Sequence, residues 1–410
     1  MTMQKPNGKI PNFRHLRAFA EVAHSGSISQ AAEQIHLSQP AITQALAKLE
    51  EILGIALFER RSDGMGLTEP GRQFLERVER ALDFVQSGAK EAIRLGAKKG
   101  GRGFGNFDQL LTTPQLRALV AVASAGNFSL AAREAGVSQP TLHRAARDLE
   151  RLSGLALFSK TSKGIDLTAS AAVLAQAVKL AFSELNQGFS EIAEVLGTDM
   201  GQIVVGTTPL PRTFMLPTAI NALLAERPDV HINVVDGPYD DLLHGLRHGD
   251  LDILIGALRI PVPIDDIVQE ALFNSPLAVV GRAGHPLGKK KTIQVADLAA
   301  YPWAIPRAGT PTREAFETLF EEAGAPSCIV ESSSLVLIRG LLQDSDRLTM
   351  ISAHQIRHER EIGLLAPLAV DLSGTSRPIG ITHRRGWRPT ATQRLFLDCL
   401  REAGQLAKAG

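Results

Sequence analysis

The sequence predicts a multidomain protein with two related helical domains in its first half and an α/β domain in its second half. Three observations support this fold class. The chain has 410 residues, which is longer than a domain with a single hydrophobic core usually is. A segment of about 50 residues recurs 100 positions later in the chain. From residue 201 onward, helical spacing of the apolar residues gives way to alternating short strands and helices.

The composition is that of a soluble globular protein. Hydrophobic residues make up 44% of the chain, charged residues make up 21%, and the net charge is +1. No apolar run is long enough to cross a bilayer, and the first residues, MTMQKPNGKIPNF, lack the apolar core of a signal peptide. We therefore expect a cytoplasmic protein without a membrane partner. Cys328 and Cys399 are far apart and are expected to be buried rather than paired or metal-bound.

The repeat aligns residues 16–68 with residues 116–168 without a gap. Of these 53 positions, 23 are identical. The two copies share LRA near the start and SQP in the middle, and GIALF in the first copy matches GLALF in the second. Such a match over one constant offset indicates that a domain has been duplicated.

Each copy has the pattern of a helix-turn-helix. A short helix and a turn precede a longer helix, whose apolar residues recur at helical spacing over residues 42–53. Ser38 stands at the N-cap of that helix and Pro40 in its first turn. The second helix of such a motif enters the major groove of DNA. The residues predicted to contact DNA are Ser29, Ser38, Gln39, Pro40, Thr43, Gln44 and Lys48 in the first copy, and Ser129, Ser138, Gln139, Pro140, Thr141, His143, Arg144 and Arg147 in the second.

The outward residues of the two longer helices differ, although their core residues match. Gln44 of the first copy corresponds to Arg144 of the second. Glutamine can pair with adenine and arginine with guanine, so the two copies are expected to prefer different base sequences. The second copy is also the more basic one. An alternative is that one copy has lost its DNA and serves only as a structural platform.

A two-stranded wing is predicted after each helix-turn-helix. Polar segments that contain glycine and end in Leu-Thr follow Leu57-Phe58 and Leu157-Phe158, namely ERRSDGMGLT and SKTSKGIDLT. Basic side chains in such a hairpin can contact DNA phosphates. Those residues are Arg60, Arg61, Lys160 and Lys163.

Together these motifs resemble the winged helix-turn-helix of LysR-type transcriptional regulators. The family pattern runs from a leucine-rich first helix through GS-x-S-x-AA, SQP, LE and LG-x-x-LF to a wing that ends in LT. The second copy departs from it with LTASA and with Ser159-Lys160, where the family usually has glutamate and arginine. The resemblance implies a regulator rather than an enzyme, with no cofactor. It implies double-stranded operator or promoter DNA, a small-molecule effector and RNA polymerase as partners, and assembly as a homodimer or homotetramer.

Helical linkers and a tether are predicted around the second copy. The first winged helix-turn-helix spans residues 11–69, the second spans residues 111–169, and each runs into an amphipathic helix, at 70–95 and 170–198. In the resembling family this helix pairs two subunits, and the alternative is that each helix packs on its own domain. The glycine-rich basic segment at 96–110, with GAKKGGRGFGN, is expected to be a flexible tether that joins the two copies loosely.

Residues 200–405 are predicted to form the α/β domain. Alternating strands and helices predict parallel βαβ units. The segment resembles the effector domain of LysR regulators, a two-lobed fold like that of periplasmic binding proteins. One lobe is expected at residues 201–259 with 377–403, and the other at 260–376. GDLDILIGALR and RPIGITHRRGWRPTATQ resemble the subgroup of the galactose-binding-protein regulator.

The effector is expected at the carboxyl ends of the strands, where loops and helix N-termini converge. Each hydroxyl residue there has an equally plain alternative role as a helix N-cap. Arg307 is a candidate clamp for an acidic ligand or a member of a surface ion pair. By match with the family's loops, the contacts are Thr207, Thr208, Pro209, Gly237, Pro238, Ala257, Leu258, Pro306, Arg307, Ser332, Ser333 and Ser352.

No motif for catalysis or metal binding is found. His244 and His248 are four residues apart, as are His354 and His358, but neither pair has the HExxH glutamate. A GxSxG elbow, a catalytic cysteine motif and a dinucleotide fingerprint are absent. The rival class is a two-lobed small-molecule-binding protein or enzyme with an appended DNA module.

Overall fold

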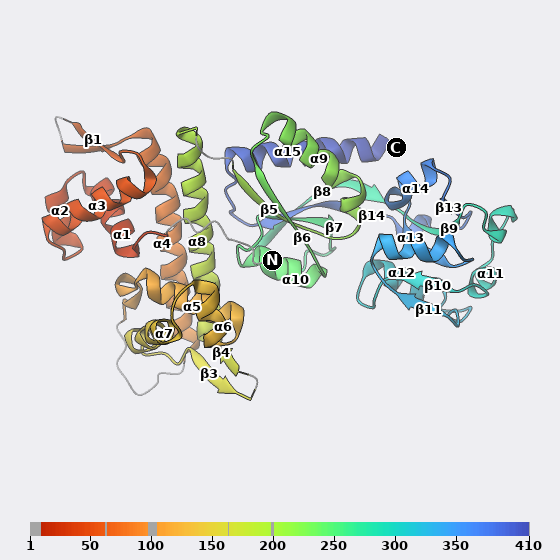
Figure 1. The fold of residues 1–410 in the computed structure, drawn as a ribbon, viewed down its shortest axis with the longest axis horizontal. Coiled ribbons are helices and arrows are strands. Elements are labelled where there is room, and N and C mark those ends of the chain that lie inside the picture. Colours follow the sequence, from red (N-terminus) through yellow and green to blue (C-terminus); the bar gives the residue numbers. More distant parts are fainter. Residues whose placement is uncertain (1–9, 62–63, 97–104, 163, 198–200, 410) are drawn as a thin grey trace. The chain divides into compact units, whose positions relative to one another are not determined.

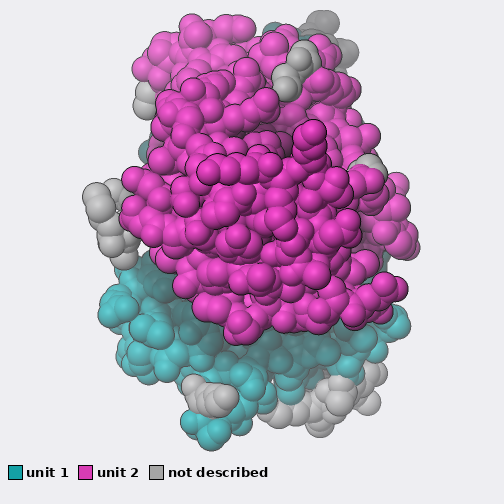
Figure 2. Space-filling view, turned by 90° about the vertical axis from the view of Figure 1, so that its right-hand side faces the viewer, with its two compact units in different colours: residues 1–201, 248–250 teal, residues 202–247, 251–410 magenta. Residues whose placement is uncertain are grey.

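The computed structural model describes residues 10–61, 64–96, 105–162, 164–197 and 201–409 (Figure 1). The chain forms two compact units, one of residues 1–201 with 248–250 and one of residues 202–247 with 251–410 (Figure 2). Among the described residues, no helix is both long enough and apolar enough to span a membrane. Lys163 and most of the expected tether, residues 97–104, lie outside the described residues.

The two copies of the repeat fold in the same order of elements. Each has three helices, a two-stranded antiparallel hairpin and a long helix. The first copy contains α1 (Phe13–Ser25), α2 (Ile28–Gln34), α3 (Gln39–Leu53), β1 (Phe58–Arg61), β2 (Gly64–Leu67) and α4 (Glu69–Leu95). The second contains α5 (Thr113–Ala125), α6 (Phe128–Ala135), α7 (Gln139–Ser153), β3 (Phe158–Thr161), β4 (Gly164–Leu167) and α8 (Ala169–Val195).

The shared motifs place the helix boundaries. The Ser38 hydroxyl accepts a hydrogen bond from the Ala41 amide at 3.4 Å and caps α3, as the SQP motif predicts. Thr68 caps α4 in the same way, and its hydroxyl also donates to the Ala56 carbonyl at 2.9 Å. The equivalent residues of the second copy, Ser138 and Thr168, cap α7 and α8. The predicted starts of α3 and α7 are therefore confirmed.

Helices α4 and α8 pack against each other within one chain and run in opposite directions (Figure 1). Phe74, near the start of α4, contacts Phe189 near the end of α8, with ring centroids 5.8 Å apart. The buried residues of both copies form one continuous hydrophobic cluster. The linker helix of this chain thus pairs with its own counterpart, whereas the family resemblance predicts pairing between two subunits.

The expectation that the two copies are joined loosely is wrong, because they are packed against each other. The Phe13 amide donates to the Thr113 hydroxyl at 3.2 Å, and that hydroxyl donates to the Pro11 carbonyl at 2.7 Å. Arg17 donates to the carbonyls of Gln109 and Asp108. Phe107, in the short 3-10 helix Phe107–Leu110, is fully buried. The copies are packed together because these contacts and the α4–α8 pair join them.

The second unit contains two five-stranded sheets. The first has the order β6-β5-β7-β14-β8 and the second the order β11-β10-β12-β9-β13. Three strands in each sheet are parallel, and the remaining two in each run antiparallel to a neighbour. The strands of the first sheet are β5 (Gln202–Thr207), β6 (His231–Asp236), β7 (Ile253–Ala257), β8 (Ile267–Ser275) and β14 (Arg377–Arg384). Those of the second are β9 (Leu277–Arg282), β10 (Trp303–Ile305), β11 (Ile329–Glu331), β12 (Leu348–Ser352) and β13 (Leu365–Pro367).

Helices cover both faces of each sheet, because the central strands are apolar on both sides. Buried residues of α9 and α15 pack on one face of the first sheet, and those of α10 pack on the other. In the second sheet, Phe316 of α12 and Ile338 of α13 belong to separate clusters. The helices are α9 (Met215–Glu226), α10 (Tyr239–Arg247), α11 (Val295–Ala299), α12 (Pro311–Leu319), α13 (Leu335–Gln343), α14 (Arg357–Glu361) and α15 (Ala391–Ala409).

Two expectations for this unit need correction, and one is confirmed. Strand β8 pairs with β14 in the first sheet, so the chain leaves the first lobe after Ser275 and not after residue 259. The predicted parallel βαβ units are confirmed by the parallel pairs of β5 with β6 and β7, and each sheet also contains a strand, β14 or β9, that runs antiparallel to its neighbours. Cys399 is buried as expected, but Cys328 is exposed in the loop before β11.

Candidate nucleic-acid interface and effector domain

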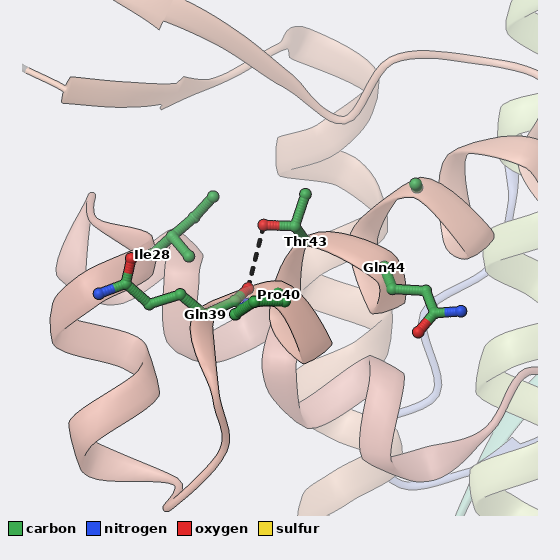
Figure 3. A pocket seen from close by; sticks show the side chains of 6 residues that line it. Ile28, Gln39, Pro40, Thr43 and Gln44 are labelled. Atoms are coloured by element: carbon green, nitrogen blue, oxygen red, sulfur yellow. Dashed lines mark hydrogen bonds between the residues drawn. The ribbon is translucent and has the colours of Figure 1, made fainter.

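The recognition helix of the first copy presents its predicted residues outward. Gln39, Pro40, Thr43 and Gln44 are exposed and, with Ile28 of α2, surround an open hollow (Figure 3). The Thr43 hydroxyl donates back to the Gln39 carbonyl at 3.0 Å. Gln39 and Gln44 therefore supply the amide groups of this surface that can form paired hydrogen bonds with a base edge. Ser29, Ser38 and Lys48 are also exposed.

The second recognition helix exposes a different set of groups. The Ser129 hydroxyl donates to Gln139 Oε1 at 3.0 Å, which joins α6 to the start of α7. The exposed His143 ring packs on Phe128, with ring centroids 5.0 Å apart. Arg144 is exposed, while Arg147 is half-buried and forms an ion pair with Glu150. Ser138, Pro140 and Thr141 are exposed as predicted.

The wings are anchored by a glutamate that the sequence analysis noted only as part of the LE motif. Glu50 Oε1 accepts hydrogen bonds from the amides of Leu57 and Phe58, at 2.8 and 3.4 Å. Glu150 accepts the same two bonds from residues 157 and 158 in the second copy. This carboxylate fixes the hairpin against the recognition helix, since charge-assisted hydrogen bonds are the stronger ones.

The basic wing residues are only partly described. Arg60 and Lys160 lie in β1 and β3 and are exposed, so both can reach a phosphate. For Arg61 only the backbone in β1 is described, and Lys163 lies outside the described residues. Lys48, at the end of the predicted recognition surface, forms a surface ion pair with Glu51 at 2.7 Å. Such exposed pairs are weak, so this one leaves Lys48 able to bind DNA.

The α4–α8 pair has an internal two-fold relation. A Cβ added at Gly88 would lie 2.3 Å from the Ala177 Cβ, and one added at Gly188 would lie 3.0 Å from the Arg77 Cβ. Gly88 and Gly188 are equivalent positions of the repeat, as are residues 77 and 177. The two contacts are therefore the same contact made twice, as in an isologous dimer interface.

A buried charge network lies in this interface around Arg77 and Glu184. Arg77 donates to Glu184 at 2.9 Å, to Gln187 at 2.9 Å and to both carboxylate oxygens of Glu191. Arg80 donates to the other oxygen of Glu184 at 2.9 Å. Burial raises the pKa of Glu184, but the hydrogen bonds from Arg80 and Arg77 outweigh it and leave the pKa lowered. The side chains of Arg77 and Glu184 are only 5% and 6% exposed, so this is a buried ion pair.

In the effector domain the predicted residues follow the strand ends, but several point inward. Thr207 is fully buried, and its hydroxyl donates to the Thr208 carbonyl at 3.1 Å. The Ser352 hydroxyl lies 2.5 Å from that of Ser275 and caps the following turn, so its N-cap role accounts for it. Arg307 and Ser333 are exposed. The other predicted residues lie at the ends of β5, β6, β7, β10 and β11, namely Pro209, Gly237, Pro238, Ala257, Leu258, Pro306 and Ser332.

Two arginines that the sequence analysis missed lie at the junction of the lobes. Arg377 begins β14 and donates to the hydroxyl of Thr312, in the first turn of α12, at 2.8 Å. Its Nε is buried and has no hydrogen-bond partner among the described residues. Burial and the nearby positive charge of Arg259 lower the pKa of Arg377 to about 10, against a smaller opposing effect of Glu314. Arg259 follows β7, with its guanidinium 4.4 Å from the ring centroid of Tyr239.

Both units resemble domains of known proteins. Residues 13–72 and 113–172 each match the model of bacterial regulatory helix-turn-helix proteins of the lysR family. Residues 197–405 match the LysR substrate binding domain. The transcriptional regulator GalR of Pseudomonas putida is 35% identical, over 96% of this chain and 98% of its own length. PcaQ of Agrobacterium fabrum is 28% identical, over 72% of this chain and 96% of its own length.

Solved structures show the same fold at lower identity. ArgP from Mycobacterium tuberculosis has a TM-score of 0.55 at 17% identity and covers 72% of this chain and 97% of its own. Full-length CbnR in complex with its target DNA has a TM-score of 0.50 at 22% identity, over 70% of this chain and 98% of its own. The chain belongs to the LysR family of DNA-binding transcriptional regulators and carries an effector-binding domain of that family.

Proposed function

We propose that this regulator binds its operator through two helix-turn-helix domains, the result of a duplication, and that both are supplied by one chain. The observation that carries the proposal is the equivalence of α3 and α7. Both helices begin at SQP and bury the same face, and both expose the polar residues that follow. A copy kept only as a platform has no need of the exposed Gln139, His143 and Arg144 on α7.

The comparisons support this proposal in two ways. GalR of Pseudomonas putida aligns over 96% of the chain, whereas PcaQ aligns over 72%, so GalR shares the length that a second copy adds. CbnR, which has the same fold, has been crystallised with its target DNA. A closer relation to the galactose-binding-protein regulator subgroup stays a prediction; GbpR of Azospirillum brasilense is 26% identical over 58% of this chain.

A pair of equivalent substitutions tests whether both copies contact bases. Gln44→Ala and Arg144→Ala remove exposed side chains that can form paired hydrogen bonds with a base, at equivalent positions of α3 and α7. If each makes a bidentate contact, each substitution costs about 1–3 kcal/mol of binding and relaxes base preference at its own half of the operator. Footprinting with base-substituted operators measures both. An unchanged preference after Arg144→Ala would show that α7 is not a recognition helix.

The basic wings supply a second, weaker contact in the same proposal. Lys160→Ala is expected to lower affinity about equally for all sequences and to reduce the slope of log affinity against log salt by about one. Arg60→Ala is the matched variant in the first copy. A change in base preference after Lys160→Ala would contradict a purely phosphate-binding role.

We also propose that the effector binds in the second unit, where the strand ends of the two lobes meet. The exposed Arg307 and Ser333 and the unpartnered Nε of Arg377 support this position. Arg377 and Arg259 lie near each other and have no ion pair with a carboxylate among the described residues, which favours an acidic effector. Homo-oligomer formation, contact with RNA polymerase and a cytoplasmic location belong to the same proposal, by analogy with the family.

The effector site is tested separately from DNA binding. Arg377→Met and the double variant Arg307→Met/Ser333→Val are expected to abolish the change in operator affinity on effector addition while leaving effector-free DNA binding intact. A ligand shifts the regulator only through its different affinities for two states, so loss of the response must follow loss of binding. Full effector binding by both variants, measured by calorimetry, would move the site elsewhere.

A further inference from the structure

The two-fold relation between α4 and α8 raises a question of partner choice. Because the helices are equivalent, three antiparallel pairings share one geometry: α4 with α8, α4 with a second α4, and α8 with a second α8. Only the first can form within one chain. The residues buried along the contact decide among the three pairings.

The observed pairing satisfies the buried charges. Arg77 and Arg80 of α4 meet Glu184 and Glu191 of α8, and Gln187 accepts a further bond from Arg77. As whole residues Glu184 and Arg77 are each 4% exposed, so water cannot replace either partner. Removing one partner of such a buried ion pair strongly destabilises the folded protein, because the other charge stays buried and unpaired.

The like pairings break this network. The repeat places Phe84, Ser87 and Glu91 in α4 where α8 has Glu184, Gln187 and Glu191. In an α4–α4 pair, Arg77 would keep one carboxylate, Glu91, and Arg80 would face Phe84. In an α8–α8 pair, Glu184 would face Ala177 and Leu180, which stand where α4 has Arg77 and Arg80. That carboxylate would then be buried without a cation.

We infer that α4 pairs with α8 of the same chain, and that the buried charges reject a pair of two α4 helices or of two α8 helices from two copies. Specificity here is a difference between a satisfied pairing and two pairings with unpaired buried charge. Given the proposed function, on which this inference rests, one chain is a complete and asymmetric DNA-binding pair. Its operator then combines one half-site for α3 with an unlike half-site for α7.

Contacts on the two-fold axis favour a partner within the chain. Phe13 and Thr113 are equivalent positions, and they are hydrogen-bonded to each other through the Phe13 amide. A Cβ at Gly96, just after α4, would lie 2.5 Å from Leu155 of the second copy. The chain therefore enters the second copy already packed against it, which leaves little freedom to exchange α8 between two chains.

Co-expression of two complementary variants tests the inference. One full-length chain carries Thr43→Ala/Gln44→Ala and the other carries His143→Ala/Arg144→Ala, so each has one intact recognition helix. If pairing is within the chain, the mixture binds the operator no more tightly than the better variant alone. Recovery of the parental affinity would mean that intact helices from two chains had paired, and would overturn the inference. Parental affinity in either variant alone would instead contradict the proposed function.

A second measurement does not depend on DNA. Glu184→Phe/Gln187→Ser gives α8 the residues that α4 has at these positions, so the full-length chain then offers α4 a partner of the rejected kind. The unfolding temperature of the first unit should fall by several degrees. The control is Glu91→Gln, at the position equivalent to Glu191. Among the described residues Glu91 pairs with the exposed Arg94 of its own helix, so this substitution should leave that temperature unchanged. An unchanged unfolding temperature in the double variant would overturn the inference.

Discussion

The two copies expose different groups at the same positions of one framework. The first presents Thr43 and Gln44 on α3, whereas the second presents His143 and Arg144 on α7. Both helices begin at the same serine cap and hold their wing through the same glutamate. The residues that position α3 and α7 are thus shared by the two copies, while the exposed residues that we propose to contact bases differ.

The long helices α4 and α8 differ in their buried residues, whereas α3 and α7 differ in their exposed residues. In a symmetric dimer every contact occurs twice, because residue i meets j wherever j meets i. Both members of a buried ion pair must therefore be present on the same helix. Two unlike copies in one chain, as proposed here, do not have that restriction. Arg77 and Ala177 occupy equivalent positions, as do Phe84 and Glu184, so each helix carries one half of an unlike pair. The first three predictions below test whether this difference determines the pairing.

The largest effect is expected from Arg77→Met. This substitution leaves Glu184 buried with Arg80 as its one cation and should cost about 3–5 kcal/mol of unfolding free energy, as for other broken buried pairs. Chemical denaturation of the full-length chain, followed by a signal from the first unit, measures the loss. Arg94→Met, on the exposed face of α4, is the matched control and should change stability by less than about 0.5 kcal/mol. Equal effects would mean that the buried network contributes nothing specific.

A smaller loss is expected from Gly88→Ala. The added Cβ would lie 2.3 Å from that of Ala177, so the helices must separate, at a cost of about 1–3 kcal/mol. Gly188→Ala is the equivalent change, and it should cost less because the nearest atom is 3.0 Å away. Denaturation of both variants gives the ranking. A greater loss at Gly188 would contradict the closer approach of the helices at Gly88.

The smallest effect concerns pH. The folded pKa of Glu184 is lowered, so its ion pairs stabilise the fold above the ordinary glutamate pKa and are lost as pH falls through the folded pKa. The unfolding temperature of the parent should therefore exceed that of Glu184→Gln at pH 7, and the difference should shrink as the pH is lowered below about 4.5. A difference that grows on acidification would require a raised pKa and would contradict the network.

Much of the helix-turn-helix could be predicted from the sequence, because local rules determine it. A serine cap and a proline in the first turn determine where α3 begins, and helical periodicity separates the buried Ile42 and Leu49 from the exposed Gln44. The partner of α4 could not be read in the same way, since an amphipathic stripe does not say what covers it. The two glycines Gly88 and Gly188 were nevertheless a signal. They interrupt long helices at equivalent positions, and a glycine inside a helix often marks a close approach.

The effector domain was less accessible to sequence reasoning. Strand β8 was missed because IVQEALFNS lacks a regular alternation and comes between two recognisable strands. Ser352 was expected at the effector because it ends a strand, but tertiary packing directs its hydroxyl to Ser275. Arg377 was missed because its position at the lobe junction depends on how two distant segments meet. Such residues have no local pattern.

The central claim is that one chain holds two unlike recognition helices as a pair, and selection of bound duplexes from a random library tests it most directly. The parental chain should select an operator made of two different half-sites. Gln44→Ala should relax the bases of one half-site, and Arg144→Ala should relax those of the other. An inverted repeat of a single half-site, sensitive to only one of the two substitutions, would contradict the claim and would show that like helices from two chains bind side by side.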